Sequence, residues 1–199
     1  MTNIQRSPTN KPIPSQGIQA LLRTASGIHL VVIVSFILLI TSQASLSYEE
    51  IKIPFNFSWG ESSSRLEAGL KSVKARIIER KQVRGRLCLV VEGIPQRLLQ
   101  RALFYFDNDA LGEIELHYGD SQWDQAKYDT FFEKTRLNIE RKYGPGRIIA
   151  RQRSVDSGVL QSLVGYQWTQ PVTALALFYY SAKKETNSFS LLSLHYRGF

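Results

Sequence analysis

The sequence predicts an α+β fold in which an antiparallel sheet has its helices packed on one face. One observation is the element order, because a helical pattern followed by several short β-rich segments occurs twice. A second observation is a pair of repeated motifs, ALFYF at 102–106 with ALFYY at 176–180 and LHY at 116–118 with LHY at 194–196, at spacings of 74 and 78 residues. We therefore expect two α-β-β-β-like units, over residues 58–119 and 120–199, the second with an extra strand.

The first unit begins with a capping box at Ser64–Glu67, which predicts a helix start. Leu66, Leu70, Val73 and Ile77 form an apolar stripe at helical spacing, so the helix is expected to continue until Gly85 ends it. Three strands are predicted after it, at 87–91, 102–106 and 113–118, with a hairpin turn over 107–112. Strict alternation in the last of these strands predicts one buried face and one wet face.

The second unit begins with a helix predicted from about Ser121 to Tyr143, which Gly144 and Pro145 terminate. Its apolar side consists of Tyr128, Phe132, Ile139 and Tyr143. Four strands are then expected, near 147–153, 164–169, 172–180 and 189–196.

The N-terminal region has the pattern of an export signal. Ile28–Ile40 is almost entirely apolar, and the residues before it include three basic and no acidic side chains. Thirteen helical residues span about 20 Å, which is short of the roughly 30 Å hydrocarbon core of a membrane. Small residues at Ser42 and Ala44 suit signal peptidase, so we expect a signal peptide over residues 1–44, cleaved after Ala44, and a linker over 45–57.

A second interpretation of the N-terminal region remains open. The apolar segment can be extended from Gly27 to Leu46 and kept as an uncleaved signal anchor. Both interpretations place the N-terminus in the cytoplasm and the rest of the chain across the membrane, in the periplasm or cell envelope, because basic flanking residues stay inside.

Composition restricts the remaining function classes. With 43% apolar residues the 199-residue chain can bury a sizeable core, and its one cysteine, Cys88, excludes an internal disulfide and a zinc site built on cysteine pairs. We expect Cys88 to be a small buried apolar residue. Without residues 1–44, 22 basic side chains remain against 17 acidic ones. This moderate excess of positive charge suggests an anionic partner.

Much of the positive charge lies between Lys71 and Arg86, where the single acidic residue is Glu79. On the predicted helix these residues form an outward basic face, which is either simply solvated or a surface for an acidic protein, lipid headgroups or glycan polymers. The candidate partner residues here are Lys71, Lys74, Arg76, Arg80, Lys81 and Arg84. No aromatic residue interleaves them, and together with export this argues against nucleic-acid binding.

The candidate partner surface also includes two tyrosines and two histidines. Tyr105 and Tyr179 are expected opposite Phe104 and Phe178, as equivalent exposed anchors. His117 and His195 are expected as outward strand residues in matched positions of the repeat.

Two chemical roles for these histidines stay open as alternatives. The two could meet and bind a metal with Glu115 or Asp120, or His117 could serve a hydrolase together with one of those acids. We predict no catalytic residue, metal site or cofactor, since no nucleophile elbow or phosphate loop is present.

The repeated order of a helix and an antiparallel meander behind an export segment resembles two groups of small exported modules. These are the β-lactamase-inhibitor proteins and the accessory proteins of outer-membrane assembly. The resemblance covers residues 54–199 and rests on element order. It implies a non-catalytic domain that binds another protein with its sheet face or loops. The chain departs from the assembly lipoproteins, because Cys88 is too far from the signal to be acylated.

The sequence thus predicts an exported, non-catalytic envelope module that binds a protein or an anionic envelope component. One alternative is a membrane-anchored subunit of a secretion or assembly complex. The other is a small envelope hydrolase that uses His117.

Overall fold

The computed structural model describes residues 48–199. The export segment, the cleavage site after Ala44 and the anchor alternative lie outside this range. Within the described range, neither helix combines the length and apolar character needed to cross a membrane.

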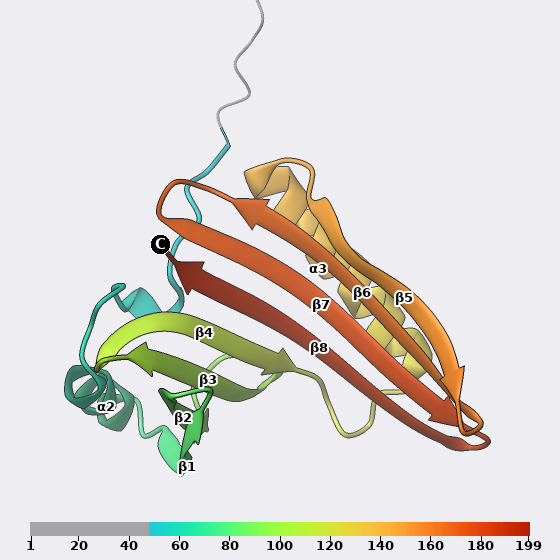
Figure 1. Ribbon diagram of the computed structural model, residues 1–199, viewed down its shortest axis with the longest axis horizontal. Coiled ribbons are helices and arrows are strands. Elements are labelled where there is room, and N and C mark those ends of the chain that lie inside the picture. Colours follow the sequence, from blue (N-terminus) through green and yellow to red (C-terminus); the bar gives the residue numbers. More distant parts are fainter. Residues whose placement is uncertain (1–47) are drawn as a thin grey trace, which may run out of the picture. The chain divides into compact units, whose positions relative to one another are not determined.

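Residues 48–199 form an α+β structure with two α-helices and one open antiparallel sheet of eight strands (Figure 1). The first half contains a short 3-10 helix η1 (Pro54–Asn56), α2 (Ser63–Ser72), β1 (Arg76–Val83), β2 (Arg86–Glu92), β3 (Leu99–Asp107) and β4 (Ala110–Tyr118). The second half contains α3 (Gln125–Tyr143), β5 (Arg147–Asp156), β6 (Val159–Thr169), β7 (Thr173–Lys184) and β8 (Asn187–Gly198). The strand order β1-β2-β3-β4-β8-β7-β6-β5 makes β1 and β5 the edges and joins the halves at β4 and β8.

Both helices pack on the same face of the sheet, as expected. Leu66 and Leu70 of α2 and Phe132 and Ile139 of α3 belong to one buried cluster with side chains of six strands. Figure 1 looks onto the opposite face of β5–β8, with α3 behind these strands. Alternation along each strand therefore sends every second side chain into this core and the others to the uncovered face.

The predicted long first helix is wrong. Helix α2 ends at Ser72, and the residues expected to continue it form strand β1, which pairs with β2 through a hairpin turn at Arg84 and Gly85. Both turn residues have positive φ, which suits the twist of a tight hairpin. The isoleucines at 77 and 78 are β-branched and favour a strand, and pairing with β2 packs Ile77 against the core.

The other predicted strands are confirmed within a few residues. The predicted hairpin turn between β3 and β4 is also present, with Asn108 and Asp109 at positive φ. Helix α3 begins four residues later than expected. Because β1 is a strand, each half contains a helix and four strands, so the expected extra strand of the second half is not a difference between them.

Part of the expected linker is packed. Ile51 is buried, and Ile53, Phe55 and Phe57 contact the core. The Ile51 amide donates to Gln170 Oε1 at 2.6 Å, which ties this segment to the second half of the sheet. Residues 51–57 thus belong to the folded domain.

The ladders of the two halves have matching registers. Leu116 pairs with Leu194 across the β4–β8 junction, so the LHY motifs at spacing 78 lie symmetrically about this pair. Ala102 is opposite Leu116, whereas the residue opposite Leu194 is Leu177 rather than Ala176. In the structure Ala102 therefore corresponds to Leu177, at a spacing of 75 residues. The alignment of ALFYF with ALFYY, at a spacing of 74, is wrong by one residue.

A third correspondence lies in the edge strands. Strand β1 begins Arg76-Ile77-Ile78 and β5 begins Arg147-Ile148-Ile149. Both strands have an irregular register at the second isoleucine. A bulge at the same place in both edges bends each strand and makes it a poorer template for further pairing.

Candidate functional site

The candidate functional site is the face of the sheet opposite the helices, which we call the open face. Within residues 48–199 no helix covers it. Its central and neighbouring strands carry Arg86, Cys88, Tyr105, Glu113, Glu115, His117, Phe178, Tyr180, Ser193 and His195. A small apolar group that includes Cys88 and Tyr105 is buried here, and the prediction of a buried Cys88 is confirmed.

Ionisable side chains meet at the β4–β8 junction of the open face, in a group that we call the central cluster. It consists of Arg86, Tyr105, Glu113, Glu115, His117, Ser193 and His195. Nε2 of His117 lies 2.5 Å from Oε1 of Glu115, and Nε2 of His195 lies 3.7 Å from the same oxygen. The two histidines thus meet at Glu115, whose other oxygen accepts a 3.1 Å hydrogen bond from Tyr105.

The second carboxylate of the cluster is held from two sides. Arg86 Nη1 donates to Oε2 of Glu113 at 2.9 Å, and Nδ1 of His195 lies 3.9 Å from Oε1. The guanidinium of Arg86 also lies over the Tyr105 ring, 4.9 Å from its centroid, as a cation–π contact. This arrangement joins β2, β3, β4 and β8 through charged and aromatic groups.

The cluster is partly desolvated, although no helix of residues 48–199 lies over it. The side chains of Glu115 and His117 are only 17% and 20% exposed. Burial opposes ionisation of Glu115, but the bond from His117, the charges of both histidines and the Tyr105 bond outweigh it and lower the carboxyl pKa. The pKa of Glu113 is also lowered, chiefly by His195 and further by Arg86. Both glutamates are therefore stabilised as carboxylates.

The predicted wet face of β4 is consequently half-buried. Ile114 and Leu116 are buried on the covered side, as expected, but Glu113, Glu115 and His117 on the other side are screened by one another. The prediction that His117 and His195 are outward strand residues misses this contact, because Glu115 becomes the cross-strand partner of His195 only through the β4–β8 pairing.

Two chemical alternatives can be compared with this geometry. Among residues 48–199 no group of three or more histidine, cysteine or acidic residues is arranged to hold a metal ion. Asp120, one suggested third ligand and acid, instead accepts from the Gln122 amide at 2.8 Å. His117 therefore has Glu115, not Asp120, as its neighbour.

A serine also contacts the second histidine. Oγ of Ser193 lies 2.9 Å from Nε2 of His195, with Glu113 beyond Nδ1, so the order of groups is that of a nucleophile, a base and an acid. Ser193 is 4% exposed, however, and it sits between β4 and β7 in a central strand whose backbone amides serve the ladders. Such a position offers no free pair of N–H groups for an oxyanion hole.

The two candidate tyrosines lie on opposite faces, so their expected equivalence is wrong. Tyr105 points to the open face, whereas Tyr179 points into the covered face and bonds to Asp129 Oδ1 at 2.8 Å. The register explains this result, because Tyr180 rather than Tyr179 occupies the ladder position that corresponds to Tyr105. Neither candidate is exposed.

The predicted basic face is divided. Lys71 is in the last turn of α2, while Lys74 and Arg84 are turn residues with positive φ. On β1, Arg80 bonds to Glu67 of α2 on the covered side, and Lys81 pairs with Glu79 at 2.8 Å on the open side. Alternation along the strand sends successive side chains to different faces, so Arg76 and Lys81 are separated from Arg80.

Aromatic side chains extend from the central cluster along the open face of β7 and β8. The Phe178 ring meets His195 edge-on at 5.0 Å, and Tyr180 meets Phe189 at 6.1 Å. Phe189 is 57% exposed. Phe189 and Tyr180 were not among the predicted partner residues, although alternation from His195 along the last strand places Phe189 on the face of that histidine.

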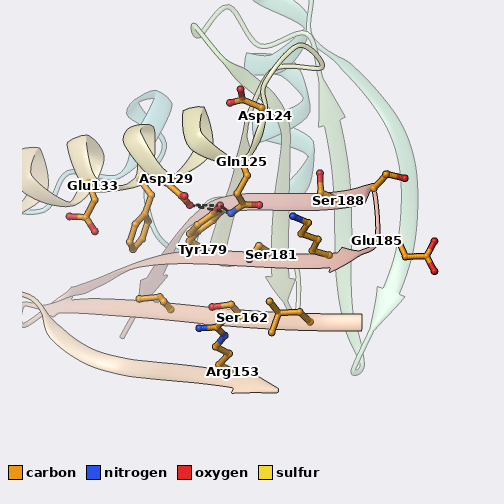
Figure 2. A pocket seen from close by; sticks show the side chains of 15 residues that line it. Asp124, Gln125, Asp129, Glu133, Arg153, Ser162, Tyr179, Ser181, Glu185 and Ser188 are labelled. Atoms are coloured by element: carbon orange, nitrogen blue, oxygen red, sulfur yellow. Dashed lines mark hydrogen bonds between the residues drawn. The ribbon is translucent and has the colours of Figure 1, made fainter. Parts of the chain in front are cut away.

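A hollow lies on the covered side, between α3 and the far ends of β5–β8, and we call it the α3 groove (Figure 2). Its volume is about 940 Å³. At its inner end Tyr179 OH and Gln125 both bond to Oδ1 of Asp129. Burial raises the pKa of Tyr179, and the neighbouring Asp129 raises it further, so this phenol remains neutral. The network fastens the first turns of α3 to β7.

Comparisons with protein-family models, with curated proteins and with solved structures found no match.

Proposed function

We propose that the chain is an exported, non-catalytic binding module of the cell envelope, and that the open face of its sheet recognises a partner protein. The observation that carries this proposal is the partly desolvated central cluster, on a face that neither helix of the described range covers. Glu113 bonds to Arg86 and Glu115 contacts both His117 and His195, so a partner that covers the cluster would bury carboxylates that already have polar neighbours.

The aromatic path beside the cluster supports a protein partner over an anionic polymer. Phe178, Tyr180 and Phe189 supply apolar and aromatic area of the kind that dominates protein interfaces. The basic side chains, in contrast, are divided between two faces and partly paired, so they form no continuous cationic track.

We also infer that the two halves are duplicated units that share one sheet. The matching LHY and Arg-Ile-Ile segments, the equal element order and the equivalent bulges support this inference. Under such a duplication, His117 and His195 are the same position in two copies. The binding face would then be a composite of both copies rather than of either one.

The two other functions remain weaker proposals. A membrane-anchored subunit of an assembly complex would use the same open face and differ in keeping residues 1–44. The hydrolase was predicted to use His117, but the serine contact lies at His195, where Ser193 is buried and the amides around it are paired, which argues against acyl transfer. Hydrolysis of a defined ester by the purified chain would support a hydrolase, and its loss in His117→Ala or in His195→Ala would show which histidine acts.

Export is tested by expressing the full chain in a bacterial host and measuring the mass and fractionation of the product. A soluble envelope species that lacks residues 1–44 supports the free module. An intact chain of 22.7 kDa in the inner membrane supports the anchored subunit. A cytoplasmic, uncleaved product contradicts both.

Recognition by the open face is tested with a photo-crosslinking amino acid at Phe189 in the full chain, expressed in its host. The matched control is the same amino acid at Leu137, which is 49% exposed on α3. We expect a discrete protein adduct from position 189 alone, and binding of the purified partner to fall at least tenfold in Phe189→Asp but not in Leu137→Asp. Equal adducts from both positions would contradict the proposal.

A further inference from the structure

The α3 groove has two walls of opposite chemistry. Asp129 lies on the helix wall, whereas Arg153 of β5 and Lys183 of β7 lie on the sheet wall. Figure 2 shows Asp129 directed from α3 toward the strands and Arg153 lying along the sheet toward Ser162. The two walls therefore display a carboxylate and two cations across one hollow.

These charges are not neutralised by ion pairs within residues 48–199. Oδ1 of Asp129 accepts neutral donors from Gln125 and Tyr179, while its Oδ2 has no hydrogen-bond partner in this range. Arg153 and Lys183 form neither an ion pair nor a side-chain hydrogen bond with any described residue. Of the other acids that line the groove, Glu133 pairs with Arg136 at 2.8 Å and Asp124 caps α3, whereas Glu185, in the turn after β7, forms no ion pair with any described residue. The unpaired charges of the groove are thus the Asp129 carboxylate on the helix, Arg153 and Lys183 on the sheet, and Glu185 at the turn.

Hydroxyl groups lie between the free charges. Arg153, Ser162 and Ser181 are direct cross-strand neighbours on β5, β6 and β7, so they form a row on the groove floor. Neither serine hydroxyl has a hydrogen-bond partner among the described residues. Phe132 and Val164 supply apolar surface beside this row.

The separation of the walls indicates the length of a matching ligand. Arg153 lies two strands away from Tyr179, which holds Asp129, and two residues further along the sheet, so the two chain positions are about 12 Å apart. An extended tripeptide spans about 10 Å between its termini, and the long side chain of Arg153 can cover the remainder. A single amino acid is too short to place its ammonium group on one wall and its carboxylate on the other.

We propose that the α3 groove binds a short peptide with free termini and an apolar centre. The ammonium group is placed at Oδ2 of Asp129, the carboxylate lies between Arg153 and Lys183, and the peptide amides face the hydroxyls of Ser162 and Ser181. The volume of about 940 Å³ lies at the upper end of the range of small-ligand sites. The groove is on the face opposite the proposed partner surface, so this site is independent of the proposed function.

The test is calorimetric titration of the purified full-length chain with the tripeptide Ala-Leu-Ala. We expect saturable binding that weakens at least tenfold when the peptide is N-acetylated, and again when its carboxylate is an amide. Free leucine distinguishes a peptide site from an amino-acid site. No binding of Ala-Leu-Ala at millimolar concentration, equal binding of the blocked peptides, or tighter binding of leucine would overturn the proposal.

Variants then locate the peptide. Arg153→Gln and Asp129→Asn should each weaken Ala-Leu-Ala at least tenfold, and Asp129→Asn should abolish the effect of acetylation. The matched control is Lys184→Gln, next to Lys183 on the same strand but directed to the other face. An equal loss in Lys184→Gln, or unchanged affinity in Arg153→Gln with an unchanged melting temperature, would place the peptide elsewhere.

Discussion

Leu116 of β4 pairs directly with Leu194 of β8, and this pair joins the two halves of the sheet on its covered face. Leu116 is 1% exposed and contributes to the same buried cluster as α2 and α3. The two halves therefore share one core, and they should unfold together.

Replacing Leu116 by alanine should lower the free energy of unfolding by about 2–5 kcal/mol, because it leaves a cavity at this junction. Urea denaturation followed by circular dichroism measures the change and should show one transition. The control is Leu137→Ala at an exposed site, with an expected change within about 0.5 kcal/mol. Two separate transitions, or a similar small change for Leu116→Ala, would contradict a shared core.

Gly165 of β6 makes room for Phe178 on the open face. A Cβ at this position would lie 2.7 Å from Cε1 of the Phe178 ring. Gly165→Ala should therefore destabilise the protein by about 1–3 kcal/mol through overpacking.

A double-mutant cycle with Phe178→Leu checks this cause. We expect Gly165→Ala to cost at least about 0.5 kcal/mol less when the ring is absent. If the two changes are additive, the ring is not the source of the strain.

The central cluster should contribute to the acid sensitivity of the fold. The pKa of Glu115 is lowered in the folded protein, so its stabilising contribution is present above its ordinary pKa of 4.5 and is lost as the pH falls through the lower folded value. The difference in unfolding free energy between the wild type and Glu115→Gln should thus shrink between pH 6 and pH 3.

Urea denaturation at a series of pH values measures that difference. Glu50→Gln, a change at an exposed position, provides the reference and should alter the unfolding free energy little. A difference between wild type and Glu115→Gln that stays constant over this range would show that Glu115 does not gain stability from its ionised form.

Asp124 caps the first turn of α3, where its carboxylate accepts from the Lys127 amide at 2.9 Å. Asp124→Ala should cost about 0.5–2 kcal/mol, whereas Asp124→Asn should retain most of the stability because the amide oxygen can also accept. Thermal unfolding distinguishes the two variants. An asparagine variant as unstable as the alanine variant would show that capping is not the main role of Asp124.

Elements with local signals could be predicted from the sequence. Gly144 and Pro145 end α3, and alternation over Glu113–Tyr118 identifies β4 and its buried side. Strand β1 could not be assigned in this way. The helical spacing of apolar residues runs on past the end of α2, through Val73 to Ile77, and so gives no sign that the helix stops at Ser72. Comparison of the Arg-Ile-Ile segments at 76 and 147 would have shown that both begin strands.

The candidate site was only partly predictable for a similar reason. His117 and His195 were identified individually, but their meeting at Glu115 depends on the β4–β8 register. A shift of one residue moves a side chain to the other face, and this is why Tyr105 and Tyr179 were wrongly treated as equivalents. The α3 groove had no sequence signal, since its charged walls come from a helix and strands separated along the chain.

The sequence by itself determined the α+β class, the end of α3, the alternation of β4 and the hairpin turn at Asn108, because each depends on neighbouring residues. Only the tertiary structure decided that Arg76–Val83 is a strand, that β4 pairs with β8, and which side chains share the open face. These features depend on hydrogen-bonded ladders between distant segments, and the free energy of those contacts outweighs local helix periodicity.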